Sequence, residues 1–265
     1  NIGDLEHLAA HAKVRSSVFG GKIMTGLLSR FGALIFLGFF LVAIWGFWPT
    51  YFSGPFHMTQ ARQQFPLYYV HAISMTLWFC LLVVQPLLIR KGYRSLHRQI
   101  GRITPLFVAF ILTVMVLLIR QQLIFMVGPD QAVPEEQVAM IPPFLFISLA
   151  SAALFGAFFT LALIHRKRTA LHARYILCTV FPIITAATDR IINRTAPTEA
   201  TFPVLVGSWL LLDIVLLTLG LWERRKLGRH NPFLIAAGLM FAMQVSMFTL
   251  AQTRPWRSFF NWFVS

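Results

Sequence analysis

Seven long apolar stretches decide what this chain can fold into. A bilayer core about 30 Å thick is crossed by a helix of about 20 mostly apolar residues, whose backbone polar groups are all paired within the helix. The composition fits such a solvent, because 57% of the 265 residues are hydrophobic and 12% are charged. We therefore predict an all-α, polytopic integral membrane protein. The seven predicted transmembrane helices are 31–52, 67–89, 103–126, 142–164, 175–193, 202–222 and 233–251.

Basic residues are distributed unevenly between the two ends of these helices. Most of the 23 Lys and Arg residues precede the first span or lie in the connections between spans two and three, four and five, and six and seven. Because Lys and Arg are enriched in cytoplasmic loops, we predict a cytoplasmic N-terminus and a C-terminus outside. Anionic lipid headgroups would bind the same loops, so the net charge of +14 indicates no nucleic-acid partner.

The segments that flank the seven-helix domain, 31–252, have compositions of their own. Residues 1–30 mix apolar and charged positions, which favours a cytoplasmic amphipathic segment. Residues 253–265 are rich in aromatic side chains, which is typical of a tail at the outer membrane interface. His7 and His11 lie one helical turn apart, but no third ligand lies near them, and no metal site is predicted.

Ionisable side chains inside a membrane are costly, and each one marks a candidate functional site. Six such or related polar residues are predicted to line a cavity open to the outside: His71, Arg120, Asp189, Arg190, Asp213 and Gln244. Gln121 or Gln122 is expected to complete it, and Arg120 is expected to pair with Asp213 or Asp189. Such a pair would either fix helix packing or belong to a site for a transported ion or small molecule.

Two histidines form a second candidate site at the cytoplasmic side. His97 and His172 each stand where a predicted helix begins its outward run. Two imidazoles that face each other across neighbouring helices can ligate haem b, with basic loop side chains available for the propionates. His165 and His230 lie at the same side and could replace one ligand. The alternative is that these histidines contact lipid headgroups.

The sequence around these histidines resembles a known family. The run His71-Ala72, Trp78, Gln85-Pro86-Leu87-Leu88-Ile89-Arg90, Leu96-His97-Arg98 and Gly101-Arg102 resembles a segment of uncharacterised bacterial multi-pass membrane proteins. These are loosely similar to haem b membrane oxidoreductases of the ferric-reductase and ascorbate-cytochrome type. Leu171-His172-Ala173-Arg174-Tyr175 is similar to that family's second histidine segment. The resemblance covers roughly residues 48 to 195 and implies a protein of the bacterial cytoplasmic (inner) membrane.

Three functional hypotheses follow. The first is an electron-transfer component that binds one haem b through His97 and His172; a second haem is not expected, because two histidine pairs on the same two helices are lacking. The second is a transporter built around the polar cavity, and the third is an accessory or assembly subunit of a larger membrane complex. A retinal protein is excluded because residues 233–251 contain no lysine for a Schiff base. Phosphate-binding loops, zinc-protease motifs and serine-hydrolase motifs are also absent from the sequence.

Overall fold

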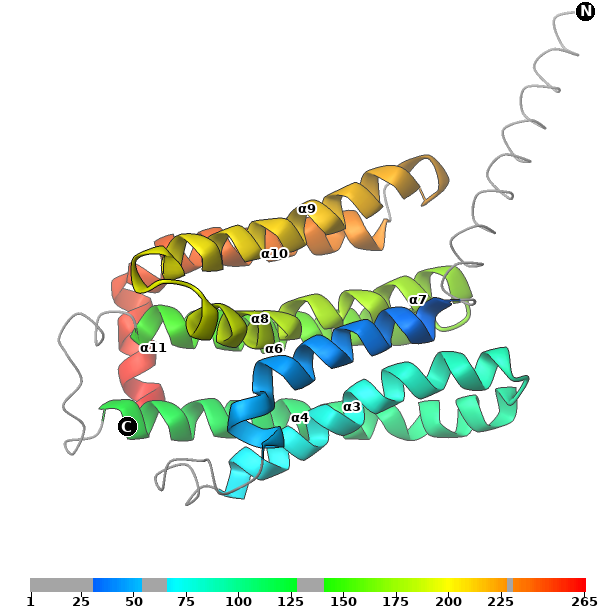
Figure 1. Cartoon of the computed structure of the whole chain (residues 1–265), viewed down its shortest axis with the longest axis horizontal. Coiled ribbons are helices and arrows are strands. Elements are labelled where there is room, and N and C mark those ends of the chain that lie inside the picture. Colours follow the sequence, from blue (N-terminus) through cyan, green and yellow to red (C-terminus); the bar gives the residue numbers. More distant parts are fainter. Residues whose placement is uncertain (1–30, 54–65, 128–140, 228–230) are drawn as a thin grey trace, which may run out of the picture.

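The computed structural model describes residues 31–53, 66–127, 141–227 and 231–265. Throughout these ranges the regular elements are helices, and seven spans are long and apolar enough to cross a membrane (Figure 1). The predicted all-α polytopic fold with seven spans is confirmed. The spans are Phe31–Phe52, Pro66–Arg90, Arg94–Val127, Ile141–Ile164, Thr169–Thr195, Thr198–Arg224 and Pro232–Gln252. The predicted amphipathic segment 1–30 and His230 lie outside the described residues.

The membrane-spanning helices run side by side along one axis, and the C-terminal helix α11 runs across them (Figure 1). Consecutive helices pack as pairs, α3 with α4, α6 with α7 and α9 with α10, and α6 also contacts α4, α8 and α10. Between α3 and α4 the chain reverses at Gly92, whose φ of 84° is favoured by glycine. The bounds are α3 Pro66–Arg90, α4 Arg94–Val127, α6 Ile141–Ile164, α7 Thr169–Cys178, α8 Val180–Thr195, α9 Thr201–Leu227, α10 Pro232–Thr249 and α11 Arg254–Val264.

Aromatic rings fill the centre of the bundle. Trp78 of α3 is 2% exposed and meets the ring of Phe155 of α6 edge-on, with the centroids 5.2 Å apart. Phe181 of α8 makes a similar contact with Phe39 of the first span, which therefore packs against α8. By contrast, large apolar side chains such as Leu106 of α4 remain 74% exposed. An apolar exterior around a packed interior is what a helix bundle in lipid requires.

The fifth span is divided into α7 and α8 at Thr179. Pro182 has no backbone N–H, so the carbonyl of Cys178 has no donor four residues ahead and the helix is interrupted there. Despite this break the span is the most deeply buried of the seven described, because 56% of the residues in its apolar stretch lie inside the protein. α7 and α8 therefore form part of the interior of the bundle.

A second proline alters the end of the first span, where a π-helical turn covers Trp48–Phe52. Pro49 cannot donate to the carbonyl of Trp45. Arg194 of α8 replaces that donor: its guanidinium donates to the carbonyl oxygens of Trp45 at 2.9 Å and Gly46 at 2.7 Å. The backbone groups freed by the proline are thus paired within the protein, as membrane burial demands.

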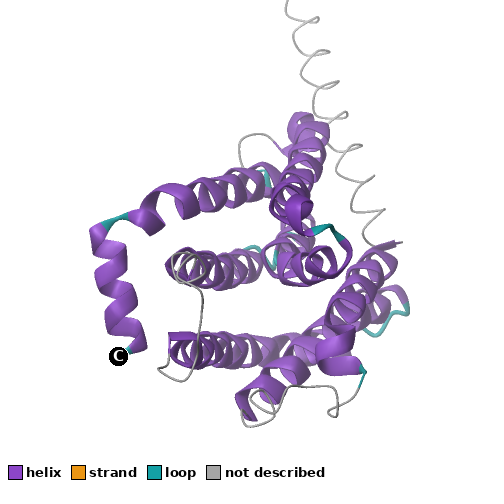
Figure 2. Cartoon of the chain, turned by 60° about the vertical axis from the view of Figure 1, so that its left-hand side comes forward, coloured by secondary structure: helices purple, strands orange, loops and turns teal. Residues whose placement is uncertain are grey.

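The two ends of the bundle differ in charge and in covering. We call one the basic end, because Arg90, Lys91, Arg94 and Arg98 of the α3–α4 turn and Arg166, Lys167 and Arg168 of the α6–α7 turn lie there. At the opposite end α11 crosses the bundle (Figure 2) and contacts α4 and α6. Phe260 of this predicted aromatic tail is buried against Leu123, Ile141 and Leu145.

Candidate functional site

The structure places His97 and His172 at the basic end, within electrostatic range of each other. His97 lies in the first turn of α4 and His172 in the first turn of α7. Both side chains are half-buried, and their rings are close enough to interact electrostatically. The sequence placed both residues at one membrane depth; the packing of α6 against both α4 and α7 places them in one neighbourhood.

Hydrogen bonding fixes the orientation of one of the two rings. Nδ1 of His172 lies 2.8 Å from the carbonyl oxygen of Ala162, near the end of α6. A carbonyl can only accept, so Nδ1 carries the proton and donates, and Nε2 of the neutral ring keeps its lone pair. Nδ1 of His97 is buried and has no hydrogen-bond partner. The backbone carbonyl of Gln85 acts on the ring of His97 as a hydrogen-bond acceptor. Both imidazoles are therefore engaged by the backbone, and Nδ1 of His97 remains without a hydrogen bond.

Among the described residues, the other histidine at this end is His165, and it is engaged elsewhere. The ring of His165 stacks on that of Tyr175, with the centroids 5.6 Å apart and the planes 10° from parallel. Arg98, the residue that follows His97 in the sequence, is near enough to act on it electrostatically. The immediate surroundings of the histidine pair are thus cationic.

A buried ion pair next to the histidines was not anticipated from the sequence. Arg174 of α7 and Glu223 of α9 form a bidentate pair, with Nε–Oε2 and Nη2–Oε1 distances both 2.6 Å, and their side chains are 0% and 1% exposed. A third nitrogen, Nη1, donates to the carbonyl of Ala170. Glu223 stands in the basic run Glu223-Arg224-Arg225-Lys226, and this lone carboxylate among cations was the available signal.

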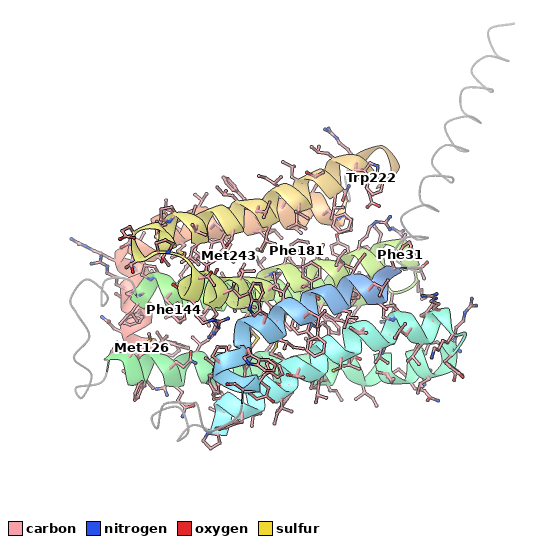
Figure 3. All side chains as sticks on the ribbon, in the orientation of Figure 1. Phe31, Met126, Phe144, Phe181, Trp222 and Met243 are labelled. Atoms are coloured by element: carbon pink, nitrogen blue, oxygen red, sulfur yellow. The ribbon has the colours of Figure 1, made fainter. Side chains whose placement is uncertain are left out.

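A cavity of about 620 Å³ lies toward the opposite end of the bundle. Side chains from the first span and from α3, α4, α6, α8, α9 and α10 line it. Figure 3 shows two of them, Phe144 and Met243, on the side away from Phe31 and Trp222, which mark the basic end. The cavity does not reach His97 or His172.

Four of the predicted polar residues line this cavity: His71, Asp189, Arg190 and Gln244. Arg190 lies within electrostatic range of both His71 and Asp189. Oδ1 of Asp189 accepts a hydrogen bond of 3.0 Å from the indole nitrogen of Trp209. The guanidinium of Arg190 donates to the carbonyl of Ala186 and lies 4.4 Å from the centre of the Phe47 ring.

Arg120 and Asp213 are placed differently from the prediction, because neither lines the cavity. Arg120 is exposed, and its Nε donates to the carbonyl oxygen of Phe263 in α11 at 3.0 Å. The expected pairing of Arg120 with Asp213 or Asp189 is therefore corrected: over the described ranges, the ion pair found is that of Arg174 with Glu223. The reason is that α11 folds back across the end of α4 and supplies the acceptor.

Asp213 of α9 is 8% exposed, and neither of its carboxylate oxygens has a hydrogen-bond partner. The side chain of Gln244 is close enough to act on this carboxylate as a donor, at a range longer than an ordinary hydrogen bond. Gln122, rather than Gln121, is the glutamine of α4 on the cavity wall. Within the described parts of the chain, no three His, Cys, Asp or Glu side chains come together as a metal site would need.

Comparisons of this chain with protein-family models, with curated proteins and with solved structures gave no match.

Proposed function

We propose that this integral membrane protein is an electron-transfer component that holds one haem b between His97 and His172 at its basic end. The observation that carries the proposal is that two imidazoles on separate helices lie at the same end of the bundle, within electrostatic range of each other, and that the backbone orients the ring of His172. When bound, the haem would supply one-electron chemistry through its iron. The other residues of the site bind and orient.

His172 has the tautomer and the support that a haem-ligating histidine would need. Its Nδ1–H donates to the carbonyl of Ala162, which leaves Nε2 as the ligand atom. Such hydrogen bonds from the outer nitrogen are common for ligating histidines; they fix the ring orientation and raise the basicity of the ligand. His97 contributes an imidazole that the backbone carbonyl of Gln85 engages and whose buried Nδ1 makes no hydrogen bond. The residues therefore fit a bis-histidine site.

The charge of the basic end suits the acidic edge of a haem. Arg94 and Arg98 flank His97 on α4 and are exposed, and Lys91 lies in the preceding turn. Guanidinium and ammonium groups bind carboxylates through charge-assisted hydrogen bonds. The same cations would contact anionic headgroups of the lipid bilayer, and they favour placing this end at the cytoplasmic face of a bacterial inner membrane. A partner subunit in the membrane would then deliver or receive the electron.

An absorption spectrum of the detergent-purified protein, oxidised and then reduced with dithionite, tests the proposal. We expect a Soret band and reduced α and β bands in protein produced with ample haem. His97→Ala and His172→Ala should each remove or shift them. His165→Ala is the matched control at the same end of the bundle, because its ring already stacks on Tyr175 and should leave the spectrum unchanged. A featureless spectrum of the unaltered protein would overturn the proposal.

The unpaired carboxylate of Asp213 favours a second candidate function, proton-coupled or ion-coupled transport. A buried carboxylate without a hydrogen-bond partner is costly in a membrane and often marks an ion or proton pathway. Proton uptake into proteoliposomes, driven by a pH gradient, should then be abolished by Asp213→Asn. It should be kept in the control variant Glu199→Gln, because Glu199 is an exposed residue of the short turn before α9. Equal uptake by the two variants would dismiss this candidate.

A further inference from the structure

The cavity at the end opposite the histidine pair has the size and the lining of a small-molecule site. Its volume of about 620 Å³ falls within the range of roughly 300–1,000 Å³ typical of ligand pockets. Apolar side chains make up most of the walls, among them many aromatic rings and four methionines. The methionines are Met75, Met115, Met243 and Met247, and the rings include Phe40, Phe47, Phe79, Phe144 and Phe202. Flat apolar molecules pack well against such walls.

Two polar atoms on the cavity residues have no partner. Nδ1 of His71 on α3 and Nε2 of Gln244 on α10 are buried and make no hydrogen bond. In a membrane interior an unmatched polar group costs about 1–3 kcal/mol, and water is not freely available to satisfy it. The amide nitrogen of Gln244 is a donor, and the neutral ring of His71 can donate from Nδ1. His71 and Gln244 both line the cavity, so two separate helices each carry a donor that makes no hydrogen bond of ordinary length; the side chain of Gln244 also acts on Asp213 at longer range.

The charges of the cavity wall select a neutral occupant. Arg190 supplies one positive charge and Asp189 one negative charge, and the two interact. Other residues already bind both side chains. Asp189 accepts a hydrogen bond from Trp209, and Arg190 donates to the carbonyl of Ala186 and lies over the ring of Phe47. An added charged ligand would leave a net charge in a low-dielectric setting, which is unfavourable.

A neutral, flat, mostly apolar molecule that accepts hydrogen bonds at two positions satisfies all of these features. We infer that the cavity binds the ring of a lipid-soluble quinone, with one ring carbonyl accepting from His71 and the other from Gln244. The membrane supplies such molecules directly, and the volume beyond the ring holds the first part of a hydrocarbon tail. This site is independent of the proposed haem: it uses other residues at the other end of the bundle, and haem-free protein should bind the quinone equally well.

Two ligands that differ only in their carbonyl groups test this inference. The probe is 2,3-dimethyl-1,4-naphthoquinone, whose methyl groups block addition of the free thiols Cys80 and Cys178 to the ring. The control ligand is 2,3-dimethylnaphthalene. Binding to the purified full chain in lipid nanodiscs, measured by equilibrium dialysis, should saturate at one quinone per chain. The hydrocarbon should bind at least about tenfold more weakly, because it cannot accept the two hydrogen bonds.

Variants locate the site. His71→Phe and Gln244→Leu should each weaken quinone binding about three- to tenfold and leave binding of the hydrocarbon unchanged. The matched control is His165→Phe, the same substitution at the basic end and outside the cavity. Gel filtration would verify that each variant is folded; if His71→Phe does not fold, the comparison of the two ligands on the unaltered protein still decides.

Several outcomes would overturn the inference. Equal affinity for quinone and hydrocarbon would show an apolar cleft filled by lipid tails, and absence of saturable binding would show no site for either. Equal effects of His71→Phe and His165→Phe would place any quinone outside this cavity. If the unaltered protein shows the haem spectrum but binds no quinone, this inference fails and the haem proposal stands.

Discussion

Replacing Glu223 with glutamine removes the charge from one half of a fully buried, bidentate ion pair. The guanidinium of Arg174 then stays in the interior without a carboxylate partner, and it keeps its hydrogen bond to the carbonyl of Ala170. Breaking a buried pair in this way costs about 3–5 kcal/mol, because the remaining charge is desolvated without compensation. Glutamine keeps the shape of glutamate and can still accept one hydrogen bond, so we expect a value near the lower limit.

Removing both charges together should cost much less. In the double variant Arg174→Met, Glu223→Leu no charge is left without a partner, and apolar side chains of similar volume often replace a buried ion pair at little or no cost. The matched control for the single substitution is Glu199→Gln, an exposed position where surface substitutions change stability by less than about 0.5 kcal/mol.

The assay is thermal unfolding of the purified protein in a mild detergent. For a chain of this size each kcal/mol moves the midpoint by about 2–4 °C, so Glu223→Gln should lower the apparent Tm by about 6 °C or more. The double variant should unfold closer to the unaltered protein than to the single variant. A shift of Glu223→Gln no larger than that of Glu199→Gln, or a double variant as unstable as the single one, would refute the reasoning.

Two further predictions concern the contact between the first span and α8. Gly46→Ala should destabilise the protein by about 1–3 kcal/mol in the same assay, because the new Cβ would lie 2.6 Å from the carbonyl oxygen of Ala187. The control is Gly38→Ala, where a Cβ would enter open space and the effect on stability should be neutral or slightly favourable. Equal effects of the two substitutions would contradict the packing described. Arg194→Ala should lower stability by about 1–2 kcal/mol, because the carbonyl of Trp45 loses the donor that replaces the missing backbone N–H of Pro49. A change below about 0.5 kcal/mol would argue against this role of Arg194.

The spans could be predicted because each is a continuous apolar run bounded by polar residues. The largest difference is in the third helix, which begins at Arg94 rather than at 103. Residues 94–102 are too polar to count toward a membrane span, yet they continue the helix into the basic end. That extension carries His97 within the first helical turn, which places it at the basic end within electrostatic range of His172.

The polar sites were only partly predictable, because sequence gives the depth of a residue but not the face of the helix it occupies. Arg120 and Gln122 are two residues apart, and positions two apart on a helix point in different directions. Gln122 lines the cavity, whereas Arg120 bonds to Phe263, which is 143 residues away in the sequence. The partner of Glu223 could not be predicted for the same reason. Arg174 is 49 residues away in the sequence, whereas Arg224 and Arg225 follow Glu223 directly.

The most direct test of the central claim is the electron paramagnetic resonance spectrum of the oxidised, haem-loaded protein, with and without added imidazole. Two imidazole ligands give a low-spin ferric haem, so we predict a low-spin signal from the unaltered protein. His172→Gly should convert it to a high-spin signal, and free imidazole should restore the low-spin form by entering the space of the lost ring. A low-spin signal that persists unchanged in His97→Gly and His172→Gly would contradict the assignment of these two ligands.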